Sequence, residues 1–110
     1  MANIDFSLFQ QLELRIGEIT DVQEVAGSSK LYKIMLAMGN GETRQILSGI
    51  KKYMTPDFLI GKQVLILVNL EPKVMAGELS NGMILMAIGD GDRPILLSPI
   101  EKIPNGSGVC

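Results

Sequence analysis

The sequence contains no histidine, and its single cysteine, Cys110, is the last residue. A His-based metal site, a Ser-His pair and a Cys-His pair are therefore impossible, and one cysteine cannot form a disulfide within the chain. The sequence also shows no acid-base pair, no metal cluster and no phosphate loop with a lysine. We therefore expect a binding protein without a metal or other cofactor, and not an enzyme.

Long apolar runs and an excess of positive charge are also absent. No run approaches the length of a membrane span, and no cationic and apolar leader is visible, so we expect a cytoplasmic, soluble protein without a membrane partner. The net charge is −2 and the isoelectric point about 5.0, so the overall field does not attract a polyanion. A nucleic-acid site would have to be a local basic patch on a mildly acidic body.

Apolar residues are abundant. They make up 46% of 110 residues, which is enough for one core, so we predict a single domain over residues 1–110. The mean hydropathy of +0.27 is high for a small soluble domain. Either a sheet with two covered faces or an apolar patch buried against a second copy would explain it.

Period-2 alternation begins the predicted sheet. Leu12 to Ile16 alternates cleanly and predicts a strand with one buried face. Ile16 and Ile19 are three residues apart, so a bulge at Gly17-Glu18 would place both inside and curl the strand. Such curling is typical of small closed barrels.

A hairpin follows. A second strand places Tyr32, Ile34, Leu36 and Met38 on one face. Gly39-Asn40-Gly41 predicts a tight turn because Asn and Gly accept positive φ at low cost. The returning strand, Glu42 to Ser48, completes a three-stranded meander.

Two short helices are predicted beside the sheet. Ser7 can cap a helical turn from Leu8 to Gln11. Thr55-Pro56-Asp57 begins the second helix, with a capping hydroxyl, a proline at the first position and an acid near the positive end of the dipole. Gly61 ends it.

The remaining strands complete a recognisable order. Gln63 to Leu70 is almost wholly apolar and predicts a strand buried on both sides, followed by strands at Met83 to Ile88 and Ile95 to Ser98. Meander, helix, buried strand, long loop and fifth strand describe an all-β fold. We predict a five-stranded OB-fold barrel with short helices and N- and C-terminal extensions.

The loop from Asn69 to Met86 is longer than a hairpin needs, which favours a functional role. In an OB barrel, its cation and those of the meander and first loop converge on one face, where they contact phosphates. Tyr32 or Tyr53 could stack on a base there. Ordinary solvated lysines are the alternative. The candidate cations are Lys30, Lys33, Arg44, Lys51, Lys52 and Lys73.

Uncharged candidates lie in the same loop and at its edges. Ser80 and Asn81 can hydrogen-bond base edges or a sugar hydroxyl, although a simple turn is the alternative. The backbone of Ser48-Gly49 could sit against a ligand or could only end a strand. Met75 and Met83 flank the loop and could form a plastic surface, or fill the core.

Several motifs, taken in order and spacing, resemble the tRNA-binding domain family, which includes the C-terminal domain of methionyl-tRNA synthetase, stand-alone tRNA-binding proteins and a bacterial export-chaperone relative. They are Leu14-Arg15-Ile16-Gly17, Lys30-Leu31-Tyr32, Ser48-Gly49-Ile50, Asn69-Leu70-x-Pro72 and Gly77-x-x-Ser80-x-Gly82-Met83. The resemblance implies an OB-fold that binds tRNA by shape. The predicted tRNA-binding residues are Lys30, Tyr32, Lys33, Arg44, Ser48, Lys51, Lys52, Asn69, Lys73, Met75, Ser80, Asn81 and Met83.

The resemblance also implies a homodimer. In dimeric members, segments before the first strand and after the fifth form the interface; here they are Ile4 to Leu12 and Ile95 to Val109. The predicted interface residues are Ile4, Phe6, Phe9, Ile95, Leu97, Ile100 and Ile103.

Two functions follow as expectations. The first is a non-catalytic tRNA-binding module that assists methionyl-tRNA synthetase, either as a dimerising subunit or as an excised domain. The alternative is a structural dimerisation or chaperone-like module that binds RNA incidentally. The single cation among Lys73, Val74, Met75 and Ala76 favours this alternative and predicts weak, salt-sensitive RNA binding.

Overall fold

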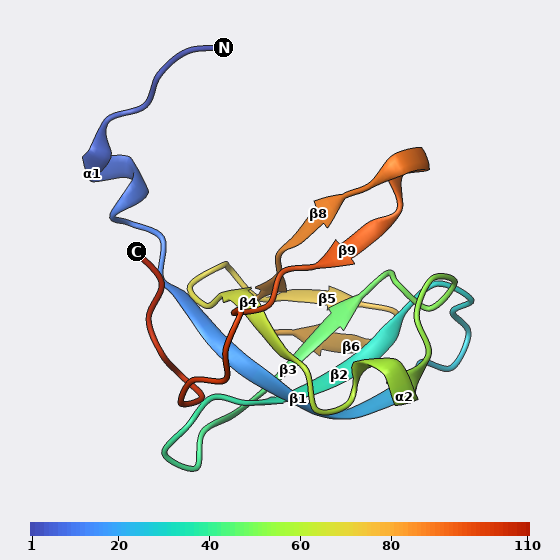
Figure 1. The fold of residues 1–110 in the computed structure, drawn as a ribbon. Coiled ribbons are helices and arrows are strands. Elements are labelled where there is room, and N and C mark those ends of the chain that lie inside the picture. Colours follow the sequence, from blue (N-terminus) through green and yellow to red (C-terminus); the bar gives the residue numbers. More distant parts are fainter.

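The computed structural model describes residues 1–110, and a curled antiparallel sheet forms its centre (Figure 1). The sheet has five strands in the order β3-β2-β1-β4-β7, which agrees with the predicted OB-like barrel. The strands are β1 (Leu14–Glu24), β2 (Tyr32–Ala37), β3 (Thr43–Ser48), β4 (Gln63–Leu67) and β7 (Met83–Ile84).

Smaller elements surround the barrel. The segment before β1 extends away from the body, and the β8–β9 hairpin projects from it (Figure 1). No helix is both long and apolar enough to cross a membrane. The elements are α1 (Phe6–Phe9), α2 (Pro56–Leu59), β5 (Lys73–Met75), β6 (Glu78–Ser80), β8 (Met86–Ile88), the 3-10 turn η1 (Asp90–Asp92) and β9 (Pro94–Leu96).

The core is the inner face of the meander, as the alternation predicted. Tyr32, Ile34, Leu36 and Met38 are all buried. The turn between β2 and β3 is also confirmed, because Asn40 has φ 52°.

The predicted bulge at Gly17-Glu18 is wrong. The β1–β4 ladder runs without interruption from Leu14 to Glu18, and the register shift against β2 falls between Ile19 and Asp21. No bulge is needed at Gly17, because strand alternation places Ile16 on the face opposite Ile19. The C-terminal segment covers that face: the Ile16 amide donates to Ser107 O at 2.9 Å.

The two short helices differ in how well they were predicted. At α2, Thr55 Oγ1 accepts a hydrogen bond from the Phe58 amide at 3.3 Å, and Pro56 is the first helical residue, as expected. At α1 a short helix is present as predicted, but the predicted cap and bounds were wrong. The helix begins at Phe6, so Ser7 lies inside it, and Asp5 at the cap makes no side-chain bond.

The strands after α2 are shorter than predicted. β4 ends at Leu67 instead of Leu70, and its Leu65 is only half-buried. The run Met83 to Ile88 is divided into β7 and β8 because Leu65 has two partners: its carbonyl accepts from the Leu85 amide at 2.9 Å, and its amide donates to Leu97 O at 3.2 Å. The C-terminal segment thus takes the place beside β4 that a continuous fifth strand would occupy.

Candidate nucleic-acid interface

A shallow groove of about 340 Å³ lies between the end of β3 and the loop that joins β4 to β7. Backbone and side chains from both elements line it, with small, polar and thioether groups facing one another. The structure brings several of the predicted residues together here. They are Ser48, Lys73, Met75, Ser80 and Met83, beside Gly49.

The predicted long loop contains a hairpin that sequence reasoning missed. β5 and β6 pair with Val74 opposite Leu79 and Met75 opposite Glu78. The turn has positive φ at both central residues, 50° at Ala76 and 80° at Gly77. Ala-Gly is a much weaker hairpin-turn signal than Asn-Gly. The two strands are also only three residues long, which is too short for an alternating pattern to be recognised.

The lysines predicted to bind tRNA differ in whether they form ion pairs within the protein. Lys30, Lys52 and Lys73 are exposed and form no ion pair. The Lys51 amide donates to Lys30 O at 3.1 Å, which places the first loop next to the segment after β3.

The other two lysines have acidic partners. Lys33 Nζ lies 3.5 Å from Glu78 Oε1, and Lys51 Nζ lies 2.6 Å from Glu24 Oε1. The hydrogen bond and charge of Lys51 hold the pKa of the Glu24 carboxyl below its usual range. A phosphate at either lysine would therefore have to displace a carboxylate.

Arg44 does not join these lysines. It pairs across the sheet with buried Leu36, so its side chain shares the core face, whereas Lys33 pairs with Leu47 on the other face. The expectation that cations of both strands point the same way is therefore wrong. In the sequence, Arg44 stands two residues before apolar Ile46 and therefore shares its side of the strand, and this was the signal that could have revealed the inward position.

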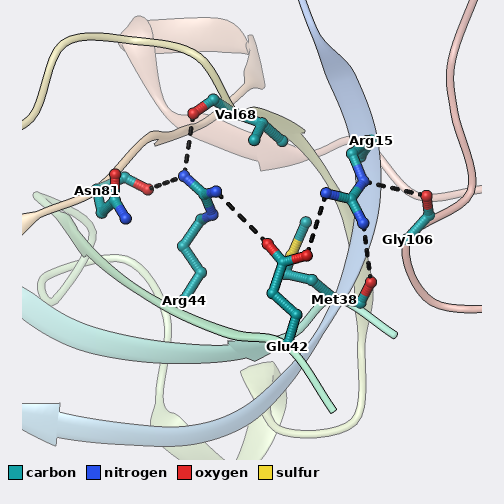
Figure 2. A network of polar contacts seen from close by, with 7 residues as sticks. All are labelled: Arg15, Met38, Glu42, Arg44, Val68, Asn81 and Gly106. Carbon is teal, nitrogen blue, oxygen red and sulfur yellow. Dashed lines mark hydrogen bonds and ion pairs between the residues drawn. The ribbon is translucent and has the colours of Figure 1, made fainter. Parts of the chain in front are cut away.

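An ion network lies at Arg44 (Figure 2). Its Nη1 donates to Val68 O and to Asn81 O, both at 3.0 Å. Its Nη2 lies 3.5 Å from Glu42 Oε2. Glu42 Oε1 in turn accepts from Arg15 Nη1 at 3.3 Å.

Arg15 connects this network to the C-terminal segment. Its Nη2 donates to Met38 O and its Nε to Gly106 O, both at 3.2 Å. Sequence analysis assigned no role to Arg15 or Glu42. The two residues are 27 positions apart in sequence, and no local pattern indicates that they are in contact.

Three further predicted residues bond within the protein. Tyr32 is buried, and its hydroxyl donates to Met54 O at 2.9 Å, so its ring is not free to stack on a base. Ser80 Oγ accepts from the Leu47 amide at 3.0 Å. Asn69 donates to Gln11 O at 2.6 Å and accepts from the Glu13 amide at 2.8 Å.

Asn81 is different, because its side-chain amide has no hydrogen-bond partner in the chain. Its backbone amide donates to Gln45 O at 2.9 Å, which closes β3 against the loop. The side chain is half-exposed and free to bind a ligand. No group of three or more Asp, Glu or Cys side chains is placed to hold a metal ion.

The residues predicted for a dimer interface are largely exposed. Phe6 and Phe9 stack with ring centroids 6.0 Å apart, and no residue of α1 is buried. Ile100 is fully exposed. A second groove, of about 540 Å³, runs beside these C-terminal residues, and its lining includes Leu97, Ile103 and Val109.

The curled five-stranded sheet, closed by a loop that forms one side of the groove, defines an OB-like domain. Residues 14–108 match the tRNA binding domain family, and the chain belongs to it. This confirms the resemblance found in the sequence.

Two methionine–tRNA ligases illustrate the relationship. The enzyme of Oceanobacillus iheyensis is 46% identical over 107 residues, and that of Methanocaldococcus jannaschii is 42% identical over 109 residues. The matches cover 96% and 99% of this chain but 16% and 17% of the ligases. The chain thus corresponds to a small part of these relatives.

Two solved structures also match over nearly the whole of both chains. The MetRS related protein from Pyrococcus horikoshii superimposes with a TM-score of 0.93 at 30% identity, covering 100% of both chains. The chaperone CsaA from Bacillus anthracis has a TM-score of 0.88 at 30% identity, covering 99% of this chain and 100% of the other.

Proposed function

We propose that this domain is a non-catalytic tRNA-binding module that assists a methionyl-tRNA synthetase in the cytoplasm, as a subunit or as part of a longer chain. The observation that carries the proposal is the groove between β3 and the β4–β7 loop, where exposed Lys73 faces the Ser48-Gly49 backbone. The family and the ligase relatives support the same assignment.

Binding would rest on a few phosphate contacts together with the shape of the groove. Lys30, Lys52 and Lys73 are available to phosphates without breaking an ion pair. Glu71 also lines the groove and repels phosphate, so the site is weakly basic at most. Such a module adds a second weak contact, which raises the effective concentration of tRNA at an attached or associated enzyme.

The double change Lys30→Ala with Lys73→Ala tests this proposal. We expect bulk tRNA to bind more weakly at low salt, and each lost phosphate contact to lower the slope of log affinity against log salt by about one. Gel shifts at several salt concentrations measure both. Lys62→Ala is the control, since Lys62 lies just before β4, beside Gly61 and Gln63, at the other end of that strand from the groove and outside the predicted interface segments.

Two outcomes decide the test. If the double variant keeps the affinity and salt slope of the parent, the groove is not the RNA site. If Lys62→Ala weakens binding as much as the double change, binding reflects net charge and not a defined face.

We further propose that the domain forms a homodimer, and that the alternative structural or chaperone-like function rests on the same apolar surface. The exposed apolar side chains of α1 and of the C-terminal segment favour this. One neighbour in structure is named a chaperone, which motivates comparing unfolded-protein binding with tRNA binding.

A further inference from the structure

One guanidinium nitrogen joins the two ends of the loop that forms the groove. Arg44 Nη1 donates to the carbonyl of Val68, just after β4, and to that of Asn81, just before β7 (Figure 2). The intervening segment, residues 69–80, contains the β5–β6 hairpin and Lys73. No other side chain in the structure bonds to both ends of this loop.

The Arg44 side chain is itself held in place. Only 14% of it is exposed, and Glu42 Oε2 lies 3.5 Å from Nη2. Glu42 is shared with Arg15, which donates to two carbonyls elsewhere in the fold. Because this position is shielded from water, its charge-assisted hydrogen bonds are stronger than those on the surface.

Each end of the loop also has contacts of its own. At the first end, the Val68 amide donates to Glu13 O at 2.8 Å, and the Asn69 side chain bonds Gln11 O and the Glu13 amide.

The second end is held against β3. The Asn81 amide donates to Gln45 O at 2.9 Å, and Gln45 Nε2 donates to Leu79 O at 3.0 Å. Ser80 Oγ accepts from the Leu47 amide. These bonds attach β6 to β3, whereas the two ends of the loop are joined to each other by the pairing of Leu67 with Met83 and by Arg44.

We propose that Arg44 is a positioning residue that fixes the β4–β7 loop, and so sets the geometry of the groove, without contacting RNA. By bonding both loop ends, it holds the β5–β6 hairpin at a set distance from the Ser48-Gly49 backbone across the groove. The consequence for tRNA rests on the proposed function, whereas the consequence for the loop does not.

The role requires arginine and not merely a positive charge. A planar guanidinium presents one nitrogen to two carbonyls and a second nitrogen to Glu42 at the same time. A lysine ammonium has a single nitrogen and cannot take both places. Arg44→Lys therefore keeps the net charge but cannot bond the two carbonyls and Glu42 at the same time.

Arg93→Lys is the matched control, since Arg93 is exposed and its side chain makes no hydrogen bond or ion pair.

Hydrogen exchange on the full chain without RNA tests the loop directly. We expect Arg44→Lys to speed amide exchange in residues 69–82 and to leave β1 and β2 as protected as in the parent, while Arg93→Lys changes neither. Unchanged exchange in the loop would overturn the proposal, and so would an equal rise throughout the barrel. If Arg44→Lys does not fold, Glu42→Gln serves instead: it keeps Arg44, removes the charge opposite Nη2, and is judged by the same two outcomes.

Binding of bulk tRNA at several salt concentrations tests the consequence for the groove. If the loop adopts its binding geometry only about one-tenth of the time in Arg44→Lys, affinity falls about tenfold. The salt slope should stay that of the parent, because no phosphate contact is lost. A slope lower by about one would show a direct phosphate contact and overturn the proposal. If the parent itself fails to bind tRNA, the proposed function fails, and the exchange experiment alone decides the role of Arg44.

Discussion

Gly17 shows how tightly the strands meet at the centre of the barrel. A Cβ atom at this position would lie 2.6 Å from Met38 Sδ and 2.7 Å from Ile66 Cδ1. Both side chains are fully buried, so neither has free space to move into. Its φ is not positive, and close packing is therefore the reason for glycine here.

Gly17→Ala should destabilise the protein by about 1–3 kcal/mol, because an extra methyl group must displace core side chains. Urea unfolding monitored by circular dichroism measures the change in the free energy of unfolding. Gly49→Ala is the control, since a Cβ there meets nothing within 4 Å and its φ is not positive. If Gly17→Ala were as stable as the parent, Met38 and Ile66 would be able to move aside for the added methyl group without loss of stability, which would contradict close packing as the reason for glycine.

Individual site residues were harder to assign than the strands that carry them. Alternation correctly placed Tyr32 on the inner face, yet Tyr32 and Arg44 were both predicted as ligand contacts. Tyr32 binds Met54 O and Arg44 binds the loop ends, and those partners lie 22 and 24 or more residues away in sequence. Residue type and position in a strand therefore suggested a function, but only tertiary contacts showed that these side chains were occupied.

At the scale of elements, the β5–β6 hairpin is the part of the groove with the weakest local support. Ala76 has φ 50°, a left-handed conformation that costs a non-glycine residue energy unless a side chain compensates. Asn tolerates this conformation better and is the preferred first residue of such a two-residue turn before glycine.

Ala76→Asn should stabilise the hairpin by about 0.5–1 kcal/mol, because it relieves this strain before Gly77. Slower amide exchange at Met75 and Glu78, the pair next to the turn, measures the effect. Ala26→Asn is the matched control: it also precedes a glycine and is exposed, but Ala26 has no positive φ. A gain of equal size at Ala26 would show that asparagine acts through something other than backbone conformation.

The elements that the sequence predicts well are those whose pattern is local. The meander and α2 follow from alternation, the Asn40 turn and the Thr55 cap, and all are present. The division of the strand from Met83 to Ile88 could not be predicted, because it depends on Leu97 binding to Leu65 from far along the chain. Ser7 was a plausible cap for a helix starting at Leu8, but the helix begins two residues earlier, at Phe6.

For the molecule as a whole, the distribution of apolar surface bears on the high mean hydropathy. The barrel buries one apolar face of its meander, but Ile4, Phe6 and Leu8 remain 67%, 70% and 50% exposed. Ile100 is exposed as well, in the C-terminal segment. Several exposed apolar side chains close together on one short segment, as at Ile4, Phe6 and Leu8, are typical of an interaction site, which favours the proposed burial against a second copy.

The dimer proposal predicts that Phe6→Asp and Ile100→Asp, made together, convert the protein to a monomer. A stable interface buries about 800 Å² per partner. That is a modest share of the 7089 Å² exposed by one chain, and the exposed residues near both termini could supply it. An aspartate placed on this surface would lose its hydration when the partner covers it. Because this loss costs free energy, the substitutions disfavour dimerisation.

Sedimentation equilibrium at micromolar concentration measures the change. The parent should have twice the 12.0 kDa mass of one chain, and the double variant the mass of one chain. Val74→Asp is the control, because Val74 is 66% exposed but lies on the β5–β6 hairpin, outside the predicted interface. A parent that sediments as a monomer contradicts the dimer, and a monomeric Val74→Asp variant would place the interface on the hairpin. In that last case the hairpin would be covered by a second copy, and Lys73 could reach tRNA only from a monomer.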